Sequence, residues 1–146
     1  MMKWEGFTPV IPGNPKVKEL VNHRERTVSI YSLEKPPKGV CIWCFKNPNP
    51  TYRHTYCSEE CKFSCYLFCY PQVYGPGYLK ALYGNKCNSC SRGFDEGHLN
   101  KQGMSLGHEV DHIIPIFKGG TALGWDNIQL LCQDCHRLKS AQERRR

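Results

Sequence analysis

The chain has 146 residues and a formal charge of +7, and ten of its residues are cysteines. This length suits one compact domain or two small ones. The sequence contains no run of about 18 apolar residues, and no charged start followed by an apolar segment. We therefore expect neither a membrane-spanning helix nor a secretory signal.

The cysteines are grouped along the chain. Three pairs have the spacing Cys-x-x-Cys, and a fourth pair has three residues between its members. Such spacings are typical of zinc ligands, so we expect a reducing, intracellular location and no disulfides. Eight thiolates with two zinc ions would lower the net charge from +7 to about +3, so the charge alone is a weak indicator of a nucleic-acid partner. The pairs are Cys41 and Cys44, Cys57 and Cys61, Cys87 and Cys90, and Cys132 and Cys135.

Residues 1–40 are rich in proline and charge and predict an N-terminal arm that packs on later parts of the chain. The stretch "KVKELVNHRERTVSIYSLE" predicts a short helix or strand, and "KPPKG" predicts an exit linker. The opening "MMKWEGFTPVIPGNP" is typical of an excised domain, so we expect the chain to be part of a larger protein. Nothing in this segment indicates a function.

Residues 41–83 predict a four-cysteine zinc finger followed by an aromatic helix. Ser58 is a suitable N-cap, and the glutamates after it suit the first turn of a helix. Cys57 and Cys61 then face the same way, and with Cys41 and Cys44 they can close a tetrahedral zinc site. The alternatives are buried free cysteines, or His54 in place of one ligand.

The helix predicted after this finger ends at Pro71. Cys65 and Cys69 lie on the same face as Cys61, as additional ligands or, in the preferred interpretation, as core residues. The many aromatic residues between positions 63 and 83 are predicted to pack the two zinc modules together, although stacking on nucleic-acid bases is an alternative.

Residues 84–146 predict a second zinc site and carry the strongest functional signal. Cys87, Cys90, Cys132 and Cys135 can supply four thiolates, which leave no open position and therefore indicate structural zinc. The segment from Gln133 onward lacks helix breakers and predicts a helix. The second zinc would hold the start of this helix beside the earlier loop.

This unit also contains four polar residues at defined spacings. The stretch "HEVDHIIPIFKGG" begins at residue 108 and has the alternation of a strand, with Asp111 and His112 on opposite faces. Asn127 follows 15 residues after His112, and His136 follows 9 residues after Asn127. The second zinc site would bring His136 toward Asp111, and His112 would be available as a base near neutral pH.

The ordered pattern "C-x2-C … E-x-D-H-I-x-P … G-G … N … L-C-x2-C-H" resembles the His-Asn-His (HNH) endonuclease family. The resemblance covers about the last 60 residues. It implies a small, zinc-rich α+β fold in which a ββα-metal nuclease unit follows the four-cysteine finger and the arm. It also implies hydrolysis of DNA phosphodiester bonds.

The resemblance also implies roles for individual residues. Asp111 and His136 would bind the catalytic cation, His112 would deprotonate the attacking water, and Asn127 would order the loop between two strands. Glu109 would support these groups from behind. Ser140 stands where some members have another histidine, and this departure favours Mg²⁺ or Mn²⁺ over Zn²⁺ as the catalytic cation.

The arm, the finger and the nuclease unit together resemble the C-terminal nuclease domains of Swi/Snf-type annealing helicases of vertebrates. This implies a nuclear enzyme acting on branched or forked DNA, with the helicase motor and most sliding-clamp contacts outside this chain. Lys118, Arg137 and Lys139 are candidates for phosphate contacts or simply solvated charges.

Two other function classes were compared with this prediction. A non-catalytic zinc module that binds DNA or protein explains the cysteines but not the ordered polar set. A zinc deaminase is excluded, because it needs His-x-Glu and then Pro-Cys-x-x-Cys. Here Glu109 directly follows His108, and Leu131 stands in the proline position.

Overall fold

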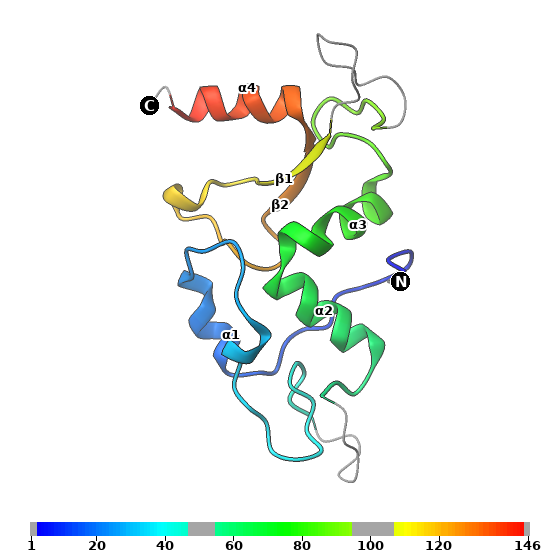
Figure 1. Ribbon diagram of the computed structural model, residues 1–146, viewed down its shortest axis with the longest axis vertical. Helices are drawn as coiled ribbons and strands as arrows, with labels where there is room; N and C mark the ends of the chain where they lie inside the picture. The colour runs from blue at the N-terminus through cyan, green and yellow to red at the C-terminus, as the bar shows by residue number, and fades with distance from the viewer. Residues whose placement is uncertain (1–2, 47–54, 95–106, 145–146) are drawn as a thin grey trace.

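The computed structural model describes residues 3–46, 55–94 and 107–144 (Figure 1). The fold is a small α+β arrangement with one two-stranded sheet, which confirms the predicted fold class. No helix in the described ranges is long and apolar enough to cross a membrane. The helices are α1 (Lys16–Glu19), α2 (Glu59–Cys69), α3 (Pro71–Tyr83) and α4 (Gln133–Arg144), the strands are β1 (His108–His112) and β2 (Ile128–Cys132), and the 3-10 turns are η1 (Leu20–Asn22), η2 (Ile30–Ser32) and η3 (Ile116–Lys118).

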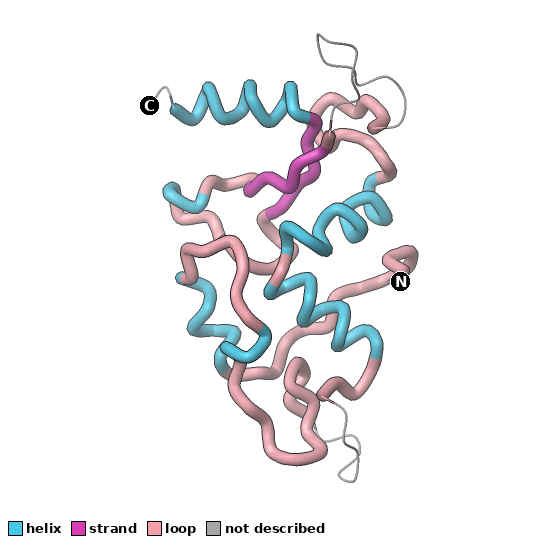
Figure 2. Tube along the Cα trace, in the orientation of Figure 1, coloured by secondary structure: helices cyan, strands magenta, loops and turns pink. Residues whose placement is uncertain are grey.

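The two strands form an antiparallel pair that ends directly in α4 (Figure 2). In β1 the side chains of Val110 and His112 are buried, whereas those of Glu109 and Asp111 are more accessible, as the alternation in the sequence predicts. The register places Asp111 opposite Gln129. The strand pair therefore presents one apolar face to the core and one carboxylate-bearing face to α4.

Helix α2 begins where the sequence predicts. The Ser58 hydroxyl accepts a hydrogen bond from the Cys61 amide at 3.1 Å, which satisfies one of the free donors of the first turn. Two glutamates occupy that turn, where the helix dipole favours negative charge. The helix ends before Pro71, also as predicted.

Helix α3 was not predicted, because its sequence "PQVYGPGYLKALY" contains an internal proline and two glycines. Those glycines allow close packing. A Cβ atom at Gly75 would lie 3.3 Å from Ile128 and 3.4 Å from Val110, and one at Gly77 would lie 2.6 Å from the Trp4 ring. Tertiary packing therefore stabilises a helix that intrinsic propensity disfavours.

Two hydrophobic clusters hold the molecule together, and each draws on distant parts of the chain. The first lies around α3 and the strands, and the second lies around α2 and the first cysteine pair. The division of the chain into three parts at residues 40 and 83 stays a prediction. Residues from all three parts contribute to each cluster. The first contains Trp4, Leu67, Tyr78, Leu79, Cys87, Phe94, Val110, Ile128, Leu130, Leu131 and Cys132. The second contains Val28, Leu33, Cys41, Ile42, Trp43, Cys61, Cys65, Cys69 and Leu123.

The N-terminal arm crosses the molecule and packs on α2, α3 and the first cysteine turn (Figure 1). The Trp4 ring packs edge-on against Tyr78, with centroids 6.1 Å apart. The indole N–H of Trp43 donates to the Val10 carbonyl at 2.8 Å. The buried Asn14 side chain donates to the Ile42 carbonyl at 2.7 Å. These contacts attach the arm to the finger region at several points along its length.

Candidate functional site: two cysteine groups and a polar cleft

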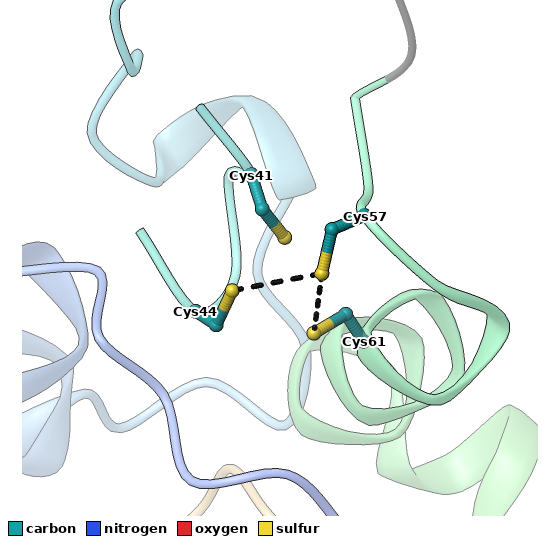
Figure 3. Close-up of side chains that lie close together, drawn as sticks. All are labelled: Cys41, Cys44, Cys57 and Cys61. Atoms are coloured by element: carbon teal, nitrogen blue, oxygen red, sulfur yellow. Dashed lines mark hydrogen bonds between the residues drawn. The ribbon is translucent and has the colours of Figure 1, made fainter. Parts of the chain in front are cut away.

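The first four-cysteine group joins a turn to the start of α2. The sulfur atoms of Cys41, Cys44, Cys57 and Cys61 point toward one another, and all lie within 4.8 Å of each other (Figure 3). The Cys44 and Cys57 sulfurs are 3.7 Å apart, and those of Cys57 and Cys61 are 3.6 Å apart. A tetrahedron of sulfurs about 2.3 Å from zinc has edges of about 3.8 Å, so this group could hold zinc.

The second four-cysteine group joins another turn to the end of β2 and the start of α4. The sulfurs of Cys87, Cys90, Cys132 and Cys135 also lie within 4.8 Å of one another. Burial raises the pKa of the Cys132 thiol, and the Cys135 amide, which donates to the Cys132 sulfur at 3.5 Å, opposes this shift only in part. This group could hold zinc as well, and its fourth member is directly followed by His136.

Arg92 adds positive charge beside the second group. Burial opposes ionisation of the Cys90 thiol, but the hydrogen bonds with Arg92, Cys87 and Cys135 together outweigh burial and lower the pKa of Cys90 to about 6. Thiolates are the form that binds metal, so this environment suits a metal ligand.

A polar cleft of about 690 Å³ lies between the hairpin, α4 and the N-terminal arm. Three of the four predicted polar site residues line this cleft. They are Asp111, His112 and His136.

The His136 ring lies between two carboxylates of β1. Its Nδ1 atom is 2.8 Å from Glu109 Oε2, and its Nε2 atom is 3.7 Å from Asp111 Oδ1. An imidazole and a carboxylate at this separation fit as two ligands of one divalent cation, with Glu109 orienting the imidazole by accepting its other N–H. Gln129 donates to Asp111 Oδ2 at 3.0 Å and fixes that carboxylate.

His112 is buried at the floor of the cleft, with 6% of its surface exposed. Its Nε2 atom lies 2.9 Å from the Ala122 carbonyl oxygen. A carbonyl can only accept, so Nε2 carries the hydrogen and the neutral ring keeps Nδ1 as a proton acceptor.

Asn127 lies across the loop that joins the strands. Its Oδ1 accepts from the Ile114 amide, and its Nδ2 donates to the carbonyls of Ile114 and Thr121, all at 2.9 to 3.1 Å. Gly120 makes room for this amide, because a Cβ there would collide with the Ile114 carbonyl and lie 2.7 Å from Asn127 Nδ2. The Asn127 side chain thus closes the loop that follows His112.

Comparison with known proteins agrees with this arrangement. Residues 87–142 match the HNH endonuclease family. The predicted resemblance is therefore confirmed for this part of the chain, which contains the second cysteine group, the hairpin and all four polar site residues.

A relative from mouse (Mus musculus) is "DNA annealing helicase and endonuclease ZRANB3", which is 44% identical over 56 residues. The match covers 38% of this chain but 4% of the mouse protein, so the chain spans a small part of that relative's length. No solved structure matches the chain.

Lys139 lies in the polar cleft and makes contacts there that the sequence did not reveal. Its ammonium lies 3.1 Å from Asp111 Oδ2 and 2.7 Å from Glu143 Oε2, and it donates to the His112 carbonyl at 3.0 Å. Burial opposes its charge, but the hydrogen bonds to Glu143 and Asp111 outweigh burial and raise the pKa of Lys139. The i, i+4 spacing of Lys139 and Glu143 on one helix face is the signal in the sequence for their ion pair.

The sequence gives several other cysteines and histidines no role or only an alternative role at a metal site. Cys65 and Cys69 are fully buried in the second hydrophobic cluster and lie outside both four-cysteine groups. His108 packs edge-on against Phe94, with ring centroids 5.2 Å apart. His54, the alternative finger ligand, lies outside the described residues.

Proposed function

We propose that this chain is the nuclease part of a metal-dependent endodeoxyribonuclease that hydrolyses DNA phosphodiester bonds. The observation that supports this proposal best is the convergence of Asp111, His112 and His136 on one cleft within the segment that matches the HNH endonuclease family. A non-catalytic zinc module would need the cysteines but would not need these three groups together.

The two cysteine groups would hold two structural zinc ions, and Asp111 with His136 would hold a separate catalytic cation. One carboxylate and one imidazole, with Ser140 in place of a further histidine, form a hard donor set that suits Mg²⁺ or Mn²⁺. Such a cation would neutralise charge on the phosphate and stabilise the leaving 3′ oxygen.

In the proposed reaction, His112 acts as the general base through Nδ1. It accepts a proton from water as the water oxygen forms a bond to phosphorus and the bond from phosphorus to the 3′ oxygen breaks. The Ala122 carbonyl holds the ring by accepting the Nε2 hydrogen. Asn127 fixes the loop around Ala122 by donating to the carbonyl of the preceding residue, Thr121. Glu109 and Gln129 keep His136 and Asp111 in place.

The finer proposals depend on the relative. By analogy with an annealing helicase and endonuclease, we propose branched or forked DNA as substrate and the nucleus as location. A helicase motor and sliding-clamp contacts would lie outside this chain. The direct test is nicking of a labelled fork and of a duplex with the same sequence, each with Mg²⁺ and with Mn²⁺. Equal cleavage of both would remove the fork preference but not the nuclease assignment.

Three variants test the division of roles. His112→Ala should abolish cleavage but leave zinc content and DNA affinity unchanged, because the base acts only on the attacking water. Asp111→Asn and His136→Ala should also cleave poorly, but high Mn²⁺ should restore part of their activity. The measurement is nicking rate against metal concentration. Equal rescue of all three variants would contradict these roles, and unfolding of His112→Ala would assign that residue to the core.

A further inference from the structure

The N-terminal arm contributes a loop of residues 23–27 that is fixed at both ends, here called the arm loop. The His23 amide donates to the Leu20 carbonyl at 3.0 Å, and His23 Nε2 lies 3.0 Å from the Thr27 carbonyl across the loop. The amide of the buried Val28 donates to the Cys69 carbonyl at the end of α2, also at 3.0 Å. Helix α2, which contains Cys61 of the first four-cysteine group, therefore positions the arm loop.

This loop meets the HNH domain at the segment after β1. Figure 1 shows α4 on one side of that segment and the loop after α1 on the other. The Arg24 guanidinium donates to the Ile116 carbonyl at 3.1 Å. Arg24 and Arg26 both line the cleft that contains Asp111, His112 and His136.

The arginines change the charge of the cleft. The hairpin and α4 contribute Lys139, which is already paired with Asp111 and Glu143. Because one ammonium faces two carboxylates, the hairpin and α4 alone give the cleft no net positive charge with which to bind a polyanion. The arm loop supplies two permanent positive charges to the same cleft.

Both guanidinium groups retain capacity for a ligand. Arg24 uses one of its five N–H donors for Ile116, and Arg26 makes no hydrogen bond or ion pair with any residue in the described ranges. Both side chains are exposed. Arg26 also borders a smaller hollow lined by Glu109 and His136, so it approaches His136 of the proposed cation-binding pair from a second side.

We propose that the arm loop is part of the DNA-binding surface of the nuclease, with Arg24 and Arg26 binding backbone phosphates next to the bond that is cleaved. This inference rests on the proposed nuclease function and assigns a role to a segment that lies outside the family match. Guanidinium groups suit this role because they bind phosphate oxygens in a bidentate manner and keep their charge. Phosphate contacts of this kind set the position of the duplex without reading its sequence.

The test measures DNA binding and cleavage of Arg24→Ala, Arg26→Ala and the matched control Lys18→Ala in the full chain. Lys18 is an exposed lysine in α1 that does not line the cleft, so the control removes the same charge from the same arm. Affinity for a labelled duplex is measured over a series of NaCl concentrations on a His112→Ala background, so that the DNA stays intact. Each arginine variant should bind roughly tenfold more weakly at low salt. The slope of log affinity against log salt should fall by about one per lost phosphate contact.

Cleavage is compared in the same three variants with His112 intact. The arginine variants should cleave more slowly than Lys18→Ala, and their zinc content and melting temperature should match the wild type. Arginine variants that bind, cleave and respond to salt like Lys18→Ala would overturn this inference while the nuclease function stands. A chain that never cleaves, yet loses DNA affinity in both arginine variants, would overturn the nuclease function but support the DNA-binding surface.

Discussion

The two four-cysteine groups begin with the same backbone turn but fix different parts of the molecule. In the first, the Cys41 amide donates to the Lys46 carbonyl and the Phe45 amide donates to the Cys41 carbonyl. In the second, Cys87, Arg92 and Ser91 repeat both hydrogen bonds at the same spacing. Phe45 and Ser91 both adopt positive φ angles, of 60° and 66°.

What differs is the second half of each group. Cys57 and Cys61 precede and begin α2, whereas Cys132 and Cys135 end β2 and begin α4. The first group therefore supports the helix that anchors the arm loop, and the second holds His136 beside β1. One recurrent turn can thus serve two purposes, depending on the element to which it is joined.

Loss of the second group should have the largest effect. Cys132→Ser should reduce zinc from two ions to one per chain and unfold the hairpin and α4, because structural zinc contributes roughly 10 kcal/mol or more to folding. Elemental analysis and circular dichroism measure both outcomes. Cys69→Ala, a buried cysteine outside both groups, is the control and should keep two zinc ions. Loss of zinc in this control would contradict the assignment of ligands.

Loss of the first group should leave the chain folded but lower its proposed nuclease activity. Cys57→Ser should also remove one zinc ion, while the hairpin keeps its own zinc and its structure. Because α2 would be loosened, the Cys69 carbonyl would no longer fix the arm loop. Cleavage should fall by about 10- to 100-fold, an effect expected when a positioning group shifts by about 1 Å. Complete unfolding of this variant would mean that the two regions do not separate as described.

A pair of buried asparagines offers a finer comparison. Asn14 joins the arm to the finger through its bond to Ile42 and links two parts of the arm through bonds to Glu34, and Asn127 closes the loop after His112. Replacement of either by alanine leaves buried backbone groups unpaired and should cost about 1 to 3 kcal/mol in urea denaturation. Cleavage under conditions where both variants are folded should fall much further for Asn127→Ala. Equal losses of activity would show that the loop around His112 needs no special ordering.

The smallest expected effect concerns the shared turn. Ser91→Gly should stabilise the second group by up to about 1 kcal/mol, because glycine removes the steric cost of a positive φ angle. The melting temperature of the zinc-loaded chain should rise by about 2 to 4 °C. Phe45→Gly should gain less, since it also removes a partly buried side chain. A larger gain for Phe45→Gly would show that its ring contributes nothing to packing.

Local signals in the sequence were sufficient for several elements. The cap at Ser58, the stop at Pro71 and the helix from Gln133 follow from side-chain chemistry within a few residues. The spacing of the cysteines and the family resemblance likewise predict that Asp111 and His136 lie near each other.

Other features depend on contacts that no local pattern reveals. Helix α3 exists because Gly75 lies against Val110 and Ile128, partners more than 30 residues away in the chain. The bond between Gln129 and Asp111 requires the strand register, which sequence alternation does not supply. The same holds for the arm loop, whose arginines are sequence-distant from every other residue of the cleft.

The anchoring of Val28 on the Cys69 carbonyl has a consequence for the order of folding during synthesis. At roughly 5 to 20 residues per second, a ribosome needs roughly 2 to 8 s to proceed from position 28 to position 69. Throughout that interval the Val28 amide lacks its partner at the end of α2, and Trp4 can pack against Tyr78 only later still. The arm, which is synthesised before the finger and the helices, is therefore among the last of these segments to pack, because it needs a finger and helices that have already emerged.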